Sequence, residues 1–203
     1  MWFVHSKITE VSMIKPVKEL PDNYEVIKKI DFDDDKKTLI LINVFSVILG
    51  LLVLAIPLAG GITRFCVSPK IFIFAAIWTL ALGAIYIVLH ELAHGIFIYF
   101  FTKEKPYFGF TKGLFYTGTD YFIPKLQYII VALSPVVILG VILHLIYINL
   151  DGYIFWIFYL IQMLNISGAI GDYYVTIVSL KLPKDIYSRD YGAKMDFYGV
   201  RNE

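Results

Sequence analysis

Four long apolar stretches dominate the sequence and limit what the chain can fold into. They span residues 38–59, 71–101, 126–148 and 153–180. Each one reaches or exceeds the roughly 20 residues that a helix needs to cross the hydrocarbon core of a bilayer. The chain of 203 residues is 58% hydrophobic, which is too apolar for an ordinary soluble domain. We therefore predict an all-α polytopic membrane protein with about four transmembrane helices.

Basic residues are distributed very unevenly among the connecting segments. Sixteen of the 18 Lys and Arg residues lie before the first apolar stretch, in the loop after the second, or after the fourth. Cytoplasmic loops carry such an excess of positive residues. We expect three parts: a cytoplasmic N-terminal segment 1–37, a transmembrane core 38–180 and a cytoplasmic tail 181–203 without an obvious core of its own. The net charge of +1 argues against a nucleic-acid partner.

Two polar segments carry local structural signals. Residues 15–32 have room for one short strand, and the acidic run 31–37 is interpreted as a solvated charge cluster. Residues 105–125 are rich in aromatic residues and glycine, with a turn signal at 111–113, and they predict a short β-hairpin on the cytoplasmic side. So many aromatic residues beside a membrane are typical of its interface or of a segment that partly re-enters it.

Only two charged side chains lie inside the apolar stretches, Glu91 in the second and Asp172 in the fourth. A carboxylate within a spanning helix costs several kcal/mol unless it is paired or bound. These stretches contain no Lys or Arg that could pair with them. A metal cation is therefore the natural partner.

Residues 90–94 read His-Glu-Leu-Ala-His and indicate where that metal binds. His90 and His94 are four residues apart, so a helix places both rings on one face. Imidazole is a good zinc ligand, and two at this spacing can share one ion. Glu91 is close enough to reach a water on the metal without being a ligand, which is the arrangement of zinc proteases. The pattern predicts a Zn²⁺ site with Glu91 as the catalytic base, although cobalt or iron would fit the same ligands.

Asp172 is the predicted third metal ligand because it lies at the same membrane depth as the histidines. His94 lies nine residues before Lys103, and Asp172 lies nine residues before Lys181, the first basic residues after their stretches. Both groups therefore lie about 14 Å from the same boundary, at about 1.5 Å per residue. A polar contact between helices is the alternative role of Asp172.

Other polar residues are weaker candidates. His144 lies near the outer end of the third stretch, too far along it to reach the site, and Cys66 lies near the outer face. Asp120, in a loop, is a second choice as third ligand. Asn165 lies two helical turns before Asp172, so it could bond a ligand or a substrate carbonyl, or form an interhelical hydrogen bond. The small residues between them, including Ser167, would let helices approach closely.

The chain resembles the zincin-like membrane peptidases of a bacterial family, distant relatives of the site-2 intramembrane metalloproteases. The similarity covers most of the chain, and the motif at 90–94 is its most specific part. It also includes residues 20–27, Asn43, the aromatic segment and residues 165–172. The resemblance implies a third ligand from an aspartate in a later helix and a bacterial inner membrane. One departure is that no glycine follows Asp172.

These observations predict an integral-membrane zinc metalloprotease that cleaves membrane or membrane-proximal proteins. Two alternatives use the same cluster: a metal-binding or transport protein, and a non-catalytic, peptidase-like adaptor. A base at Glu91 has no purpose in an adaptor. A transporter needs polar residues along a whole path, and the outer halves of the four stretches have almost none. The sequence leaves the natural substrate and the oligomeric state open.

Overall fold

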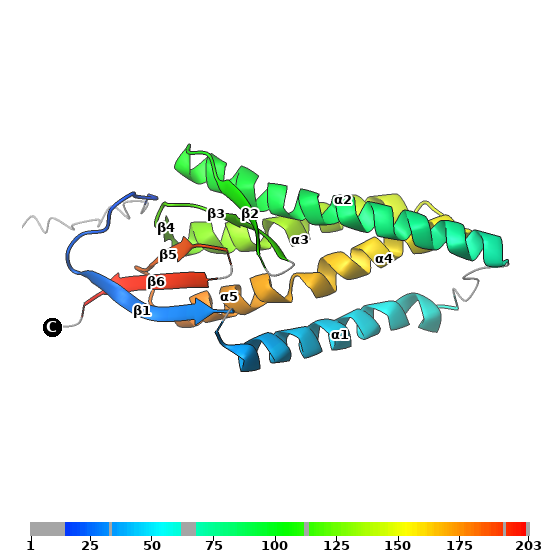
Figure 1. Ribbon diagram of the computed structural model, residues 1–203, viewed down its shortest axis with the longest axis horizontal. Helices are drawn as coiled ribbons and strands as arrows, with labels where there is room; N and C mark the ends of the chain where they lie inside the picture. The colour runs from blue at the N-terminus through cyan, green and yellow to red at the C-terminus, as the bar shows by residue number, and fades with distance from the viewer. Residues whose placement is uncertain (1–14, 33, 62–67, 112–113, 193, 202–203) are drawn as a thin grey trace, which may run out of the picture.

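The computed structural model describes residues 15–32, 34–61, 68–111, 114–192 and 194–201. Its helices run along the long axis of the molecule, and strands gather at one end (Figure 1). In chain order the helices are α1 (Lys36–Ala59), α2 (Pro69–Thr102), α3 (Lys125–Tyr147), α4 (Gly152–Gly168) and α5 (Ile170–Lys181). Cys66 and the residues 112–113 of the expected turn lie outside the described residues.

In the described part of the chain, four helical segments are long and apolar enough to cross a membrane: α1, α2, α3, and α4 together with α5. Each begins and ends within about two residues of an apolar stretch, so this part of the prediction is confirmed. Polar caps define two of the starts. The Thr38 amide donates to the carboxylate of Asp35, and the Ile71 amide donates to the hydroxyl of Ser68. The acidic run therefore ends in a helix cap.

The fourth apolar stretch forms two helices rather than one. The helix stops at Gly168, and Ala169 separates it from α5, which begins at Ile170. The break places Asp172 in the first turn of a new helix. The predicted membrane depth of Asp172 assumed one continuous helix, and the break makes that assumption too simple.

A four-stranded antiparallel sheet joins the two ends of the described chain. Its strands are β1 (Tyr24–Asp31), β6 (Lys194–Val200), β5 (Tyr187–Asp190) and β4 (Ile123–Pro124), and they lie in that order across the sheet. The prediction of one strand within residues 15–32 is confirmed. The prediction of an all-α fold was incomplete, because the tail is half of this sheet.

The sheet shares a core with the adjacent ends of the helices. Phe197 in β6 is fully buried, and Ile30 in β1 and Ile98 in α2 belong to the same hydrophobic cluster. This core explains why the tail folds although it has no apolar run of its own. The few large apolar side chains of the tail pack against helices. The sequence of the tail alone therefore does not reveal this core.

A separate antiparallel pair of strands lies between α2 and α3 in the chain, and its place on the cytoplasmic side stays a prediction. It consists of β2 (Tyr107–Thr111) and β3 (Leu114–Gly118), paired antiparallel. The hairpin turns back along α2, where Gly95 leaves room for the ring of Phe108. A Cβ atom at Gly95 would lie 2.7 Å from that ring, so the hairpin approaches α2 more closely than other residues would allow.

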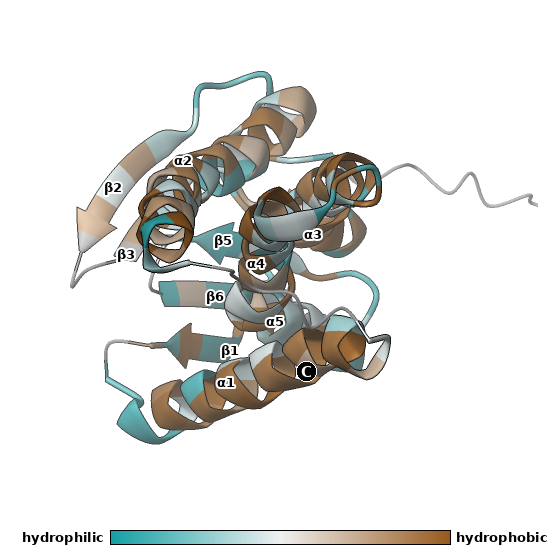
Figure 2. Cartoon of the chain, turned by 90° about the vertical axis from the view of Figure 1, so that its right-hand side faces the viewer, coloured by the Kyte–Doolittle hydropathy of each residue, from teal (hydrophilic) through white to brown (hydrophobic). Residues whose placement is uncertain are grey.

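Helix α4 is the central helix of the bundle. It contacts α1, α2 and α3, whereas α1 packs mainly against α4 and α5. Seen along the bundle, α4 lies between the other helices, and α1 lies at the side, its ribbon coloured almost entirely as hydrophobic (Figure 2). Many large apolar side chains of α1 are exposed, including Ile40, Leu51 and Ile56, as expected of a helix that faces lipid.

Candidate metal centre and its pocket

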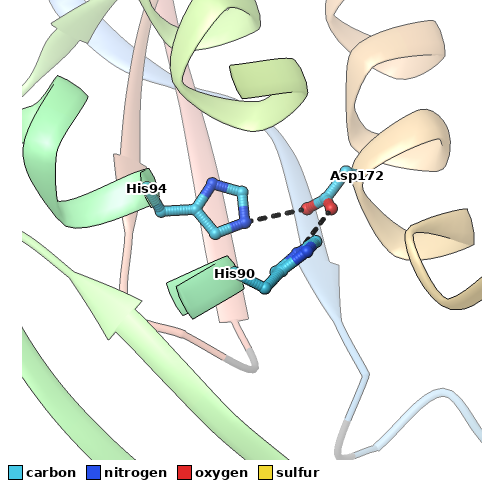
Figure 3. Close-up of side chains that lie close together, drawn as sticks. All are labelled: His90, His94 and Asp172. Atoms are coloured by element: carbon cyan, nitrogen blue, oxygen red, sulfur yellow. Dashed lines mark ion pairs between the residues drawn. The ribbon is translucent and has the colours of Figure 1, made fainter. Parts of the chain in front are cut away.

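Three side chains from two helices converge at the break between α4 and α5. His90 and His94 lie one turn apart on α2, and Asp172 lies on α5 (Figure 3). The Nε2 atom of His90 is 3.3 Å from Oδ2 of Asp172, and Nε2 of His94 is 3.5 Å from Oδ1. One ligand atom from each residue falls within a group spanning no more than 4.8 Å. The structure thus brings together the three residues that the sequence analysis nominated.

Hydrogen bonds on the far side of each ring assign the imidazole tautomers. Nδ1 of His94 is 2.9 Å from the backbone oxygen of Val131, which can only accept, so this nitrogen carries a proton. In the neutral ring, Nε2 then has a free lone pair that points at Asp172. His94 is therefore held in the form that binds a metal through Nε2.

His90 is oriented in the same way through a chain of two side chains. Asn165 donates through Nδ2 to the oxygen of Val136, so its Oδ1 accepts from the hydroxyl of Tyr86. Because the Tyr86 proton is used there, its oxygen accepts from Nδ1 of His90, 2.9 Å away. Asn165 is fully buried, and its described hydrogen bonds are with Tyr86 on α2 and with α3.

The donor set suits a divalent metal ion. Four ligands arranged tetrahedrally around zinc at about 2.0–2.2 Å are about 3.4 Å apart, close to the two observed separations. Two neutral nitrogen lone pairs directed at one carboxylate repel it unless a cation lies between them or a proton is gained. A metal held by His90, His94 and Asp172 satisfies all three groups together.

Glu91 lies next to these ligands and is held by the hairpin. The hydroxyl of Thr117 in β3 lies 2.9 Å from both the Oε2 atom and the backbone oxygen of Glu91. Thr117 is buried. The hairpin therefore fixes the carboxylate that was predicted to be a base. No motif in the sequence pointed to Thr117 in this role.

A second carboxylate faces the same pocket. Asp190, at the end of β5, lines the pocket with Glu91, His94 and Asp172. One carboxylate oxygen accepts a hydrogen bond from the Gly192 amide at 2.7 Å, and the other accepts one from the hydroxyl of buried Tyr128 at 2.8 Å. Burial raises the pKa of Asp190 to about 6, and these two hydrogen bonds to the charged form oppose the rise. The tail gave no local sign that one of its residues reaches the pocket.

The weaker sequence candidates lie elsewhere. His144 forms a hydrogen bond with Tyr147. It lies 13 residues after Val131 on α3, so it is about 20 Å along the helix from the backbone oxygen that contacts His94. Asp120 is exposed and forms an ion pair with Arg189. At Ser167, one of the small residues of the fourth stretch, α4 and α1 approach closely. The backbone oxygen of Ser167 accepts a hydrogen bond from the hydroxyl of Ser46 on α1.

Comparison with protein families gives a match over this part of the chain. A family model described as "Putative zincin peptidase" matches residues 83–187. The chain belongs to this zincin family. The matched segment runs from the middle of α2 to the first residue of β5, so it contains the three clustered residues, Glu91 and the hairpin. No match was found among curated proteins or among solved structures.

The family match and the geometry of the side-chain cluster both point to a metallopeptidase. A zincin family is a family of metallopeptidases, and the cluster of His90, His94 and Asp172 is compatible with a metal site. The helices that carry these residues belong to segments long and apolar enough to cross a membrane.

Proposed function

We propose that this protein is an integral-membrane zinc metalloprotease that hydrolyses peptide bonds of membrane or membrane-proximal proteins. The observation that carries the proposal is the convergence of His90, His94 and Asp172 beside Glu91. Zinc held by the first three would act as a Lewis acid and lower the pKa of a bound water towards about 7. The site-2 proteases are the class that this arrangement most resembles.

Glu91 acts as the general base and then as the general acid. Its carboxylate takes a proton from the attacking water as the water oxygen bonds to the peptide carbon. The same proton passes to the leaving nitrogen as the carbon–nitrogen bond breaks. Thr117 supports this role because its hydroxyl holds Oε2 of Glu91 in one position.

The hairpin is proposed to dip into the membrane from the cytoplasmic side. Thr117 contacts Glu91, which lies 11 residues before the end of α2, or about 16 Å along the helix. The exposed aromatic rings of Phe108, Phe110 and Phe115 suit a lipid or interfacial setting. Lys103 and Lys125, at the helix ends nearest the hairpin, fit the cytoplasmic side.

One edge of β3 has no strand partner among the described residues, and we propose it as the place for the substrate backbone. β2 and β3 form a two-stranded sheet, and β3 is the strand that contacts Glu91. An extended peptide could pair with such an edge, which would expose its amide bonds to attack. This mode of binding requires a locally unwound segment of the substrate.

The test compares purified wild type and Glu91→Gln, both loaded with zinc in detergent. A mixture of peptides made from solubilised membrane proteins is the substrate, and cleavage is mapped by mass spectrometry. We expect Glu91→Gln to keep about the zinc content of wild type and to cleave about 10²–10⁴-fold more slowly. Glu104→Gln is the matched control, because Glu104 follows the same helix and its ion pair with Lys18 is exposed.

Two results would contradict the proposal. Full cleavage by Glu91→Gln would remove the general-base role. A wild type that binds zinc and cleaves none of the peptides would favour the non-catalytic alternative.

A further inference from the structure

Asp190 is a carboxylate in the pocket that the proposed chemistry does not use. The pocket is lined by the catalytic candidate Glu91, by His94 and Asp172, and by Asp190. Three of these four groups are acids. Asp190 belongs to the sheet, not to the helices that carry the metal cluster.

The carboxylate of Asp190 is held in a fixed orientation. One oxygen accepts from the Gly192 amide, and the other accepts from the hydroxyl of Tyr128 in the first turn of α3. The backbone oxygen of Asp190 also accepts from the Thr119 amide and from the Tyr107 hydroxyl. Each carboxylate oxygen can accept more than one hydrogen bond, so both retain capacity for a ligand.

The charges of the pocket do not balance without a further cation. A divalent metal held by the cluster would offset the charges of Glu91 and Asp172, because imidazole binds a metal as a neutral ligand. Among the described residues that line the pocket there is no Lys or Arg, so an ionised Asp190 leaves a surplus of one negative charge. An uncompensated charge in a partly buried pocket is costly, and a ligand that brings a positive charge relieves this cost.

A purely structural role accounts for only part of this arrangement. A structural role uses one hydrogen bond at each carboxylate oxygen, from the Gly192 amide and from the Tyr128 hydroxyl. Each oxygen can accept a further hydrogen bond, so this role leaves the carboxylate able to bind a ligand.

We propose that Asp190 determines specificity, by binding a cationic nitrogen of the substrate next to the scissile bond. The inference rests on the proposed peptidase function. The nitrogen is either the side chain of Lys or Arg, or a free α-amine at the substrate N-terminus. Both present N–H donors to a carboxylate, and the test separates them.

The test measures binding of small hydroxamates, which chelate zinc, to the zinc-loaded protein by calorimetry. N-acetyl-lysine hydroxamate carries the side-chain cation, and N-acetyl-norleucine hydroxamate is its neutral counterpart. Norleucine hydroxamate with a free amine carries the other cation. N-acetyl-glutamate hydroxamate is the anionic comparison.

We expect one of the two cationic compounds to bind wild type about 10–100-fold more tightly than neutral N-acetyl-norleucine hydroxamate, as a charged hydrogen bond of about 1.5–3 kcal/mol implies. Asp190→Asn should reduce this preference to less than about twofold while zinc content stays unchanged. Asp190→Glu should keep part of it. Asp120→Asn is the matched control, because Asp120 is an exposed aspartate paired with Arg189.

The outcomes separate this inference from the proposed function. Equal binding of charged and neutral compounds, or a preference that survives in Asp190→Asn, overturns the role of Asp190 and leaves the metal site intact. Absence of zinc from wild type overturns both. Should Asp190→Asn fail to fold, wild type alone still decides, since the inference requires the order cationic, neutral, anionic.

Discussion

The two helical segments that supply the metal cluster reach it in different ways. α2 is unbroken over 34 residues, and its two histidines follow from regular helical spacing. The fourth stretch is interrupted at Ala169, and Asp172 follows the interruption. Spacing within one regular helix is a local property of the sequence. The position of Asp172 depends on where a helix stops and restarts, which is decided by packing against other helices.

The same contrast holds for the residues behind the cluster. His94 is oriented by a backbone oxygen, that of Val131, which any residue would provide. His90 is oriented by the specific pair Tyr86 and Asn165. One histidine of α2 thus depends on the backbone of α3, and the other depends on particular side chains of α2 and α4. The experiments below test this difference.

Removal of the cluster residues should have the largest effect. We expect the double variant His90→Ala, His94→Ala and the single variant Asp172→Ala each to lower zinc affinity more than about 100-fold. Loss of a residue that only hydrogen-bonds a metal ligand typically costs about 10–100-fold, and loss of a ligand should cost more. The double variant removes two donors and should lose more. Metal content and competition with a chelator measure both, with His144→Ala as the control. Zinc retained at full affinity in Asp172→Ala would mean that the break between α4 and α5 has no part in the site.

The next effect should come from the hydroxyl that links the two segments. Tyr86→Phe removes the acceptor for Nδ1 of His90, and we expect zinc affinity to fall about 10–100-fold with the helices intact. The control is Tyr159→Phe, which removes another buried hydroxyl, bonded to the backbone oxygen of Val53. If both variants bind zinc as wild type does, His90 needs no fixed tautomer.

A glycine on α3 tests the packing of Asn165. A Cβ atom at Gly140 would lie 2.9 Å from Nδ2 of Asn165, which is buried and held by two hydrogen bonds. We expect Gly140→Ala to reduce the free energy of unfolding by about 1–3 kcal/mol. Gly83→Ala is the control, since its Cβ atom would meet Ile161 at an ordinary 3.7 Å. Unfolding in mixed micelles measures both, and an equal effect would show that Asn165 can move freely.

The smallest effect concerns Asp190, which neither helical segment supplies. Its pKa is about 6 in the folded protein against 3.8 as the ordinary value, so folding favours its protonated form. This contribution to stability is complete below about pH 4 and is lost as the pH rises through 6. In metal-free protein, Asp190→Asn should therefore gain about 1–2 kcal/mol relative to wild type between pH 4 and pH 7.5, discounted for partial exposure. A difference that does not change with pH would contradict the burial of a charged Asp190.

The sequence predicted the parts of the molecule that depend on local pattern. The apolar stretches marked the helices, and the spacing of His90 and His94 marked one face of α2. Tyr86 was missed although it lies one turn before His90 on the same face, which is a usable signal. Asp190 had no such signal, because its contact with Tyr128 joins residues 62 positions apart.

The sheet was missed for a related reason. β1 pairs with β6, so that Tyr24 lies opposite Val200, and no local pattern relates them. The break at Ala169 was missed because the small residues between Asn165 and Asp172, among them Gly168 and Gly171, were interpreted as residues that let helices pack closely. Gly171 has open space around it, and it lies in the first turn of α5 instead.

The order of strands also determines when the molecule can be completed during its synthesis. β6 lies between β1 and β5, so β1 has no partner until residues 194–200 have left the ribosome. At about 5–20 residues per second, that delay after β1 is on the order of 10 to 30 seconds. The wall of the pocket that contains Asp190 belongs to the same late assembly. All five helices, which end at Lys181, are therefore synthesised before the pocket has its last wall.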